Sequence, residues 1–195
     1  MTNQKRKAMS TKNLVMYAVL TAIVVILQYL GAFIKFGPFS ISLVLVPIVI
    51  GAALLGPLAG AWLGTVFGIT VLWSGDATAF LTVNVVGTVI TVLAKGALSG
   101  LVTGLVFKLL NKYNLYLAIA VSAIVCPVVN TGVFLIGCFL FFMETITGWA
   151  QGLGFESTSG YIIYGLVGGN FLFEVLINII LAPAIVRLLK IKNFN

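Results

Sequence analysis

The last apolar run of the chain, residues 161–189, reads YIIYGLVGGNFLFEVLINIILAPAIVRLL. A helix needs roughly 20 apolar residues to cross the hydrocarbon core of a bilayer, which is about 30 Å thick. This run is longer than that, and Glu174 lies near its middle. It therefore predicts a transmembrane helix with an ionisable group close to the midplane of the membrane.

The composition of the whole chain extends this prediction. Of the 195 residues, 61% are hydrophobic and 8% are charged, whereas soluble domains carry about 25% charged residues. We therefore expect an all-α integral membrane protein, a compact bundle of about six transmembrane helices with short loops. The expected spans are residues 14–33, 40–55, 57–73, 80–110, 115–143 and 161–189.

The basic residues predict how the chain is oriented. With six spans their clusters share one face, which the positive-inside rule assigns to the cytoplasm together with both termini. The net charge of +7 thus reflects topology, and we expect no nucleic-acid partner. We expect a basic cytoplasmic tail (1–13), a single transmembrane domain (14–189) and a cytoplasmic C-terminal tail (190–195). The clustered basic residues are Lys5, Arg6, Lys7, Lys12, Lys108, Lys112, Arg187, Lys190 and Lys192.

The residues that the chain lacks argue against an enzyme. It has no His, which removes imidazole acid–base chemistry and the common His-based nucleophile systems. It has no Gly-rich nucleotide loop of the Walker type, and its four acidic residues are too few for a metal cage. We therefore expect no catalytic residue, no metal and no cofactor. Any active transport must take its energy from a partner or from an ion gradient.

Two ionisable residues lie at membrane depth, Lys95 in the fourth span and Glu174 in the sixth. Such a group costs roughly 2.5–3.5 kcal/mol on insertion scales, so its presence needs a reason. Three explanations remain open. The two residues pair with each other, Lys95 extends towards the cytoplasmic interface, or at least one of them contacts a substrate.

Amide side chains accompany these charges. Asn170, Glu174 and Asn178 are spaced by four residues and form one polar stripe on the sixth span. Asn130 lies at a similar depth in the fifth span, and Asn84 lies just inside the outer end of the fourth. Amides and a carboxylate at one level predict a pocket that recognises a small polar molecule by hydrogen bonds. The alternative is hydrogen bonding between helices without a ligand.

Glycines recur every four residues in two of the spans. Residues four apart share a helix face, and small residues allow helix backbones to approach closely in lipid. We therefore predict tight helix packing along these faces. The glycines are Gly56, Gly60, Gly64 and Gly68 in the third span, and Gly96, Gly100 and Gly104 in the fourth.

The chain resembles the substrate-binding S components of energy-coupling factor (ECF) vitamin transporters, within the riboflavin-transporter-like group. The resemblance rests on about six spans in under 200 residues, on a basic N-terminal tail and on the motif Ala-x-x-x-Ala in the first span. Here the motif reads AVLTA, from Ala18 to Ala22. In the family these alanines pack on the transmembrane coupling subunit. The resemblance therefore implies that Ala18 and Ala22 form that interface.

The resemblance also implies a pocket near the outer face, lined by the fourth to sixth spans and closed by two outer loops. Asn130 and Asn170 resemble asparagines of riboflavin-type members. Those members carry a lysine shortly after the second asparagine, where this chain has Glu174. A carboxylate suits a substrate with N–H donors, such as an aminopyrimidine. Anionic pantothenate would instead require Lys35 or Lys95.

We therefore expect a subunit that binds a vitamin or related small nutrient at the outer face of a bacterial cell membrane. Its partners would be a coupling subunit and two cytoplasmic ATPases, as the resemblance implies. A gradient-driven carrier with Glu174 as its proton site, and a structural membrane protein without a ligand, remain as alternatives. The expected substrate-binding residues are Asn84, Asn130, Asn170, Glu174, Lys35 and Lys95.

Overall fold

The computed structural model describes residues 10–32, 35–36, 39–40 and 43–193. Almost all of these residues are helical. Two two-residue strands between the first two helices, β1 (Lys35–Phe36) and β2 (Phe39–Ser40), pair antiparallel. The helices are α1 (Thr11–Ala32), α2 (Leu45–Leu55), α3 (Pro57–Trp73), α4 (Thr78–Leu81), α5 (Val85–Leu110), α6 (Leu115–Phe141), α7 (Met143–Gly152), α8 (Thr158–Gly160), the π-helical η1 (Tyr161–Val167) and α9 (Gly168–Asn193).

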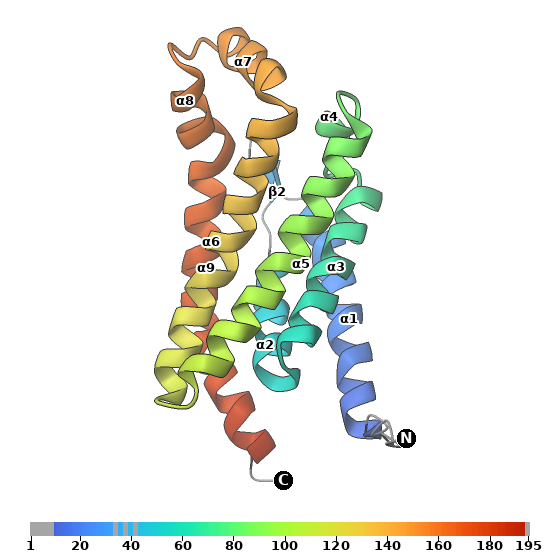
Figure 1. The fold of residues 1–195 in the computed structure, drawn as a ribbon, viewed down its shortest axis with the longest axis vertical. Coiled ribbons are helices and arrows are strands. Elements are labelled where there is room, and N and C mark those ends of the chain that lie inside the picture. Colours follow the sequence, from blue (N-terminus) through green and yellow to red (C-terminus); the bar gives the residue numbers. More distant parts are fainter. Residues whose placement is uncertain (1–9, 33–34, 37–38, 41–42, 194–195) are drawn as a thin grey trace, which may run out of the picture.

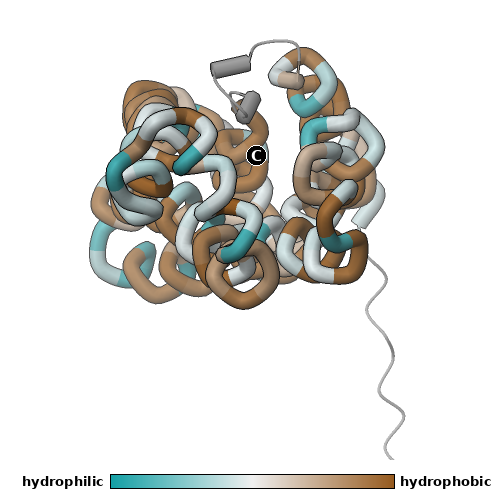
Figure 2. Tube along the Cα trace, turned by 90° about the horizontal axis from the view of Figure 1, so that it is seen from above, coloured by the Kyte–Doolittle hydropathy of each residue, from teal (hydrophilic) through white to brown (hydrophobic). Residues whose placement is uncertain are grey.

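Within the described residues, four helical stretches are long and apolar enough to cross a membrane. They are α1, α5, α6 and the continuous stretch Thr158–Lys190, which joins α8, η1 and α9. The helices α2 and α3 are apolar but shorter, with 11 and 17 residues. Large apolar side chains such as Leu58, Phe139 and Leu172 are exposed, and the helical trace is mostly hydrophobic when seen along the bundle (Figure 2). The fold is therefore that of a multi-pass, all-helical membrane protein.

The bundle has two chemically different ends. The start of α1, the α2–α3 and α5–α6 turns and the end of α9 lie at one end, and α4, α7 and α8 lie at the other (Figure 1). The first end carries Lys108 in the last turn of α5 and Arg187 and Lys190 in α9. The opposite end carries Asp76 in the α3–α4 loop and Glu144 in α7. We call these the basic end and the acidic end.

The predicted glycine packing is confirmed between α3 and α5. A Cβ atom added to Gly60 or Gly64 would collide with the backbone carbonyl of Gly100 or Gly96 on the facing helix. The two helix backbones therefore touch, which small residues permit. The turn that starts α3 depends on glycine for another reason, because Gly56 has a φ of 100°, a conformation that other residues rarely adopt.

Two expected boundaries are corrected. The fourth span was expected to run unbroken from residue 80, but the chain turns at residues 82–84 and α5 begins at Val85. The side chain of Asn84 accepts a hydrogen bond from the backbone of Gly87 and caps α5. Residues 144–160, between the fifth and sixth expected spans, were expected to form a polar loop, but most of them belong to α7 and α8. Ile146 and Ala150, one turn apart, are buried, and this apolar face holds α7 against the bundle.

Candidate functional site

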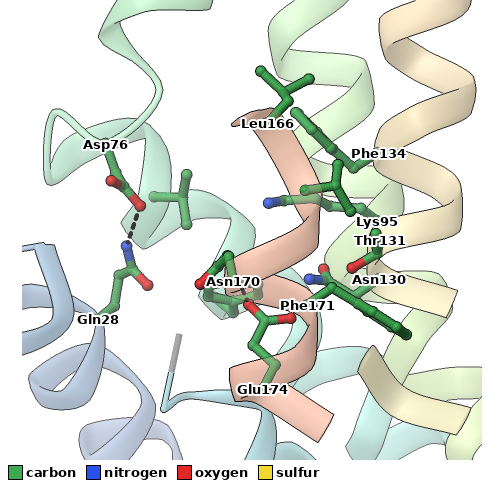
Figure 3. A pocket seen from close by; sticks show the side chains of 13 residues that line it. Gln28, Asp76, Lys95, Asn130, Thr131, Phe134, Leu166, Asn170, Phe171 and Glu174 are labelled. Atoms are coloured by element: carbon green, nitrogen blue, oxygen red, sulfur yellow. Dashed lines mark hydrogen bonds between the residues drawn. The ribbon is translucent and has the colours of Figure 1, made fainter. Parts of the chain in front are cut away.

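A polar cavity lies inside the bundle, where α1, α3, α5, α6 and α9 converge. Its volume is about 50 Å³, enough for a few water molecules. The wall combines charged and amide groups with aromatic rings, and the polar groups come from elements far apart in the sequence (Figure 3). The lining residues are Gln28, Phe67, Val71, Asp76, Lys95, Asn130, Thr131, Phe134, Leu166, Val167, Asn170, Phe171 and Glu174.

The helix α9 contributes a carboxyl group to this wall. Glu174 is only 2% exposed, and its Oε1 accepts a hydrogen bond of 3.3 Å from Nδ2 of Asn170, one turn earlier. Asn178 donates through Nδ2 to the backbone carbonyl of Glu174 at 2.8 Å. The predicted polar stripe is therefore present. It begins three residues after the π-helical segment η1 ends, and such segments are frequent at functional sites.

Lys95 on α5 supplies the positive charge of the cavity. Its ammonium lies 5.6 Å from the ring centre of Phe67 and 5.3 Å from that of Phe134, within the range of cation–π attraction. Lys95 and Glu174 line the same cavity, but these two described side chains form no ion pair with each other. Because the ammonium points into the cavity (Figure 3), Lys95 does not extend towards the basic end either. This geometry matches neither a direct ion pair with Glu174 nor an extension towards the basic end, and a ligand contact of Lys95 stays a prediction.

Asn130 on α6 provides an acceptor without a partner. Its side chain is 5% exposed, and among the described groups nothing donates a hydrogen bond to its buried Oδ1. Leaving such an atom unpaired costs about 1–3 kcal/mol. Since Asn130 lines the cavity, a donor on a bound molecule would satisfy it.

Gln28 and Asp76 complete the cavity on the side of the acidic end. Gln28, near the end of α1, donates through Nε2 to Oδ2 of Asp76 at 3.2 Å and to the hydroxyl of Ser74 at 3.4 Å. These bonds connect α1 to the α3–α4 loop across the cavity. Sequence reasoning did not select either residue for the site. The available signals were a glutamine inside an apolar span and one of only four acidic residues.

A second cavity of about 40 Å³ adjoins the first. Lys95, Phe134, Val71 and Asp76 line both, so these side chains separate the two spaces. Thr91 lines the second cavity, and its buried hydroxyl has no hydrogen-bond partner among the described residues. A molecule larger than a few waters therefore requires these dividing side chains to move.

The remaining expected residues lie elsewhere. Asn84 caps α5 and is not among the described residues that line either cavity. Lys35 belongs to β1, and its side chain lies outside the described part of the chain. Ala18 and Ala22 are one turn apart and exposed on α1. Their contact with a coupling subunit stays a prediction.

The comparison with protein families agrees with this architecture. The model of the family "ECF transporter, substrate-specific component" matches residues 12–186, which is most of the chain. No curated protein matches the sequence. Members of this family are substrate-binding subunits of transporters and associate with the coupling and ATPase subunits of the ECF module. This chain therefore belongs to the family of substrate-specific components of ECF transporters.

Proposed function

We propose that this protein captures a vitamin or related small nutrient at the outer face of a bacterial cell membrane for ATP-driven uptake by its partner subunits. The observation that carries the proposal is the cavity in which Lys95, Asn130, Asn170 and Glu174 converge. Three of these residues were selected from the sequence for their common depth. Polar groups at membrane depth are costly unless they serve a purpose.

The cavity favours a planar molecule that carries both donors and acceptors. Glu174 and the Oδ1 of Asn130 accept hydrogen bonds, whereas the ammonium of Lys95 donates. Phe67 and Phe134 offer ring faces near that ammonium, which lies 5.6 and 5.3 Å from their ring centres. A nitrogen heterocycle with exocyclic N–H groups, such as an aminopyrimidine, would meet these groups. An anionic substrate would have to place its negative charge beside the ammonium of Lys95 and away from the carboxyl group of Glu174, which lines the same cavity.

The expected topology is part of the proposal. Six spans, counting the shorter α2 and α3, would put both termini and the basic end in the cytoplasm. The substrate cavity would then open towards the acidic end, beneath the bond between Gln28 and Asp76. One single transmembrane domain, residues 14–189, would contain the whole site, with short tails at 1–13 and 190–195.

Exposed small residues on α1 support the proposed coupling surface. Ala18 and Ala22 present a flat strip to the outside of the bundle, flanked by the exposed side chains of Val15, Val19 and Ile26. Small residues one turn apart permit close approach of a second helix in lipid. We propose that this strip contacts the transmembrane coupling subunit.

Identification of co-purified small molecules tests the proposal most directly. Protein purified in mild detergent is denatured, and the released compounds are identified by mass spectrometry. We expect a vitamin-like heterocycle from the wild type and a strong depletion from the Asn170→Ala and Glu174→Ala variants. Asn84→Ala serves as the control, because this amide caps α5 and is not among the described residues that line either cavity. Equal retention by all variants would contradict the proposed site.

The energy source distinguishes this proposal from a gradient-driven carrier. Uptake is measured in cells with and without the ECF ATPases, and with and without an uncoupler. We expect uptake to require the ATPases. Uptake that persists without any ATPase and stops with an uncoupler would instead assign Glu174 the role of a proton site.

A further inference from the structure

A third hollow lies on the outside of the bundle, between α6 and α9. Its volume is about 580 Å³, more than ten times that of the polar cavity. Apolar side chains such as Ile124, Ile179 and Val186 form its walls. Ala182 and Pro183 in α9 are short and leave space between the two helices. We call this hollow the α6–α9 groove.

The mouth of the groove lies at the basic end and is positively charged. Arg187 and Lys190 line it from α9, and Tyr116 lines it from the first turn of α6. All four acidic residues of the chain lie elsewhere: Asp76, Glu144 and Glu156 in segments at the acidic end, and Glu174 in the polar cavity.

The mouth already contains an ordered set of donors. The ammonium of Lys190 donates to the hydroxyl oxygen of Tyr116 at 2.8 Å and lies 5.2 Å from the centre of its ring. This bond uses one lone pair of the Tyr116 oxygen and leaves its proton available to donate. Arg187 is exposed and makes no hydrogen bond or ion pair within the described part of the chain. An Arg guanidinium of this kind binds phosphate oxygens in a bidentate manner.

The dimensions of the groove suit a lipid. From Tyr116 to Ile124 the helix advances eight residues, or about 12 Å at 1.5 Å per residue. The groove thus begins at the end of the transmembrane helices and extends into the depth of one leaflet. A donor cluster at the interface above an apolar channel is the chemistry of a phospholipid headgroup and acyl chain.

We propose that the α6–α9 groove binds one anionic phospholipid, with its phosphate on Arg187, Lys190 and Tyr116 and an acyl chain along the apolar wall. The charge of the groove mouth favours an anionic lipid. A zwitterionic headgroup would place its own positively charged group beside Arg187 and Lys190. The proposed coupling strip lies on α1, across the bundle from α6 and α9 (Figure 1). A lipid in the groove would therefore remain in place while a coupling subunit contacts α1.

Spin-labelled lipids test the proposal on the intact protein in bilayers. The protein is placed in phosphatidylcholine nanodiscs, and the immobilised fractions of spin-labelled phosphatidylglycerol and phosphatidylcholine are compared. The measurement uses about 0.5 M salt, where screening leaves mainly close contacts. We expect a clear preference for phosphatidylglycerol that falls by up to about 25-fold in the double variant R187Q/K190Q, since each basic residue near anionic lipid is worth about a fivefold factor.

Two further variants make the result specific. The matched control K12Q/K108Q removes the same charge from exposed sites outside the groove, and we expect it to keep the preference. Ala120→Phe fills the groove and should abolish lipid immobilisation while leaving the basic residues in place. Equal losses in both double variants, or an unchanged preference in R187Q/K190Q, would overturn the proposal. If R187Q/K190Q keeps the lipid preference but no longer assembles with the coupling subunit, the groove is a protein interface instead.

Discussion

Replacing Asn130 by leucine separates a ligand-binding amide from a packing amide. The buried Oδ1 of Asn130 has no hydrogen-bond partner among the described groups and borders the polar cavity. Leaving a buried acceptor unpaired costs about 1–3 kcal/mol. Leucine has the same number and branching of side-chain heavy atoms and no polar atom, although it is bulkier. We therefore expect Asn130→Leu to raise the stability of the ligand-free protein, by up to about 1–2 kcal/mol.

The same substitution should weaken ligand binding. In the wild-type complex, Oδ1 of Asn130 would accept a hydrogen bond from the ligand. In Asn130→Leu this bond is absent, and the donor group of the ligand is buried without a partner. The cost is again about 1–3 kcal/mol, which corresponds to a roughly 5- to 150-fold higher Kd. If Asn130 contacts the ligand, Asn130→Leu should therefore raise the stability of the ligand-free protein and lower its affinity for the ligand. A substitution that only disturbs packing would not raise the stability.

The assays are thermal unfolding in detergent without ligand, and calorimetric titration with the compound identified by mass spectrometry. Asn178→Leu is the control, because its Oδ1 is also buried and unpartnered within the described chain, yet Asn178 does not line the cavity. We expect its Kd to stay within about twofold of the wild type. If Asn130→Leu lowers stability and leaves the Kd unchanged, the amide has a structural role and the reasoning is refuted.

The other predictions concern packing, coupling and closure. Gly64→Ala should lower stability by about 1–3 kcal/mol, because its Cβ meets the backbone of α5. Gly132→Ala is the control, because nothing lies within 4 Å of the added Cβ, and it should raise stability by about 0.5–1 kcal/mol. If Gly64→Ala and Gly132→Ala change stability equally in unfolding assays, the close packing of α3 and α5 is contradicted. Ala18→Leu with Ala22→Leu should abolish uptake but preserve ligand binding; lost binding would mean that the strip has another role. Gln28→Leu should increase both the association and the dissociation rate in stopped-flow measurements, since it removes the bonds to the α3–α4 loop. A change in dissociation alone would make Gln28 a ligand contact.

The membrane character and the polar stripe on α9 were predictable from the sequence because both follow from local patterns. Hydropathy over about 20 residues identifies a spanning helix, and a spacing of four places Asn170 and Glu174 on one face. The cavity wall opposite was not predictable in the same way. Gln28 and Asp76 are 48 residues apart in the sequence, and the packing of α1 against α3 brings them together.

Expected and observed roles differ most at Asn84. Its position in an apolar run suggested a buried polar group within a span, but the chain turns just before α5 and uses this amide as a cap. Asn is among the most favoured residues at a helix start. A capping signal and a polar group inside a span look alike in a single sequence when the neighbouring residues are all apolar.

The walls of the polar cavity differ in how firmly they are held, and this difference bears on how a substrate would enter. On the side of α3 and α5, backbones touch along a glycine seam that a sliding motion would disrupt. On the side of the acidic end, the described contacts across the cavity include two side-chain bonds from Gln28, at 3.2 and 3.4 Å. Breaking them costs about 1 kcal/mol each, far less than separating α3 from α5. Since the two cavities together hold only a few waters, a substrate must displace something, and the bonds of Gln28 cost less to break than the contacts between α3 and α5.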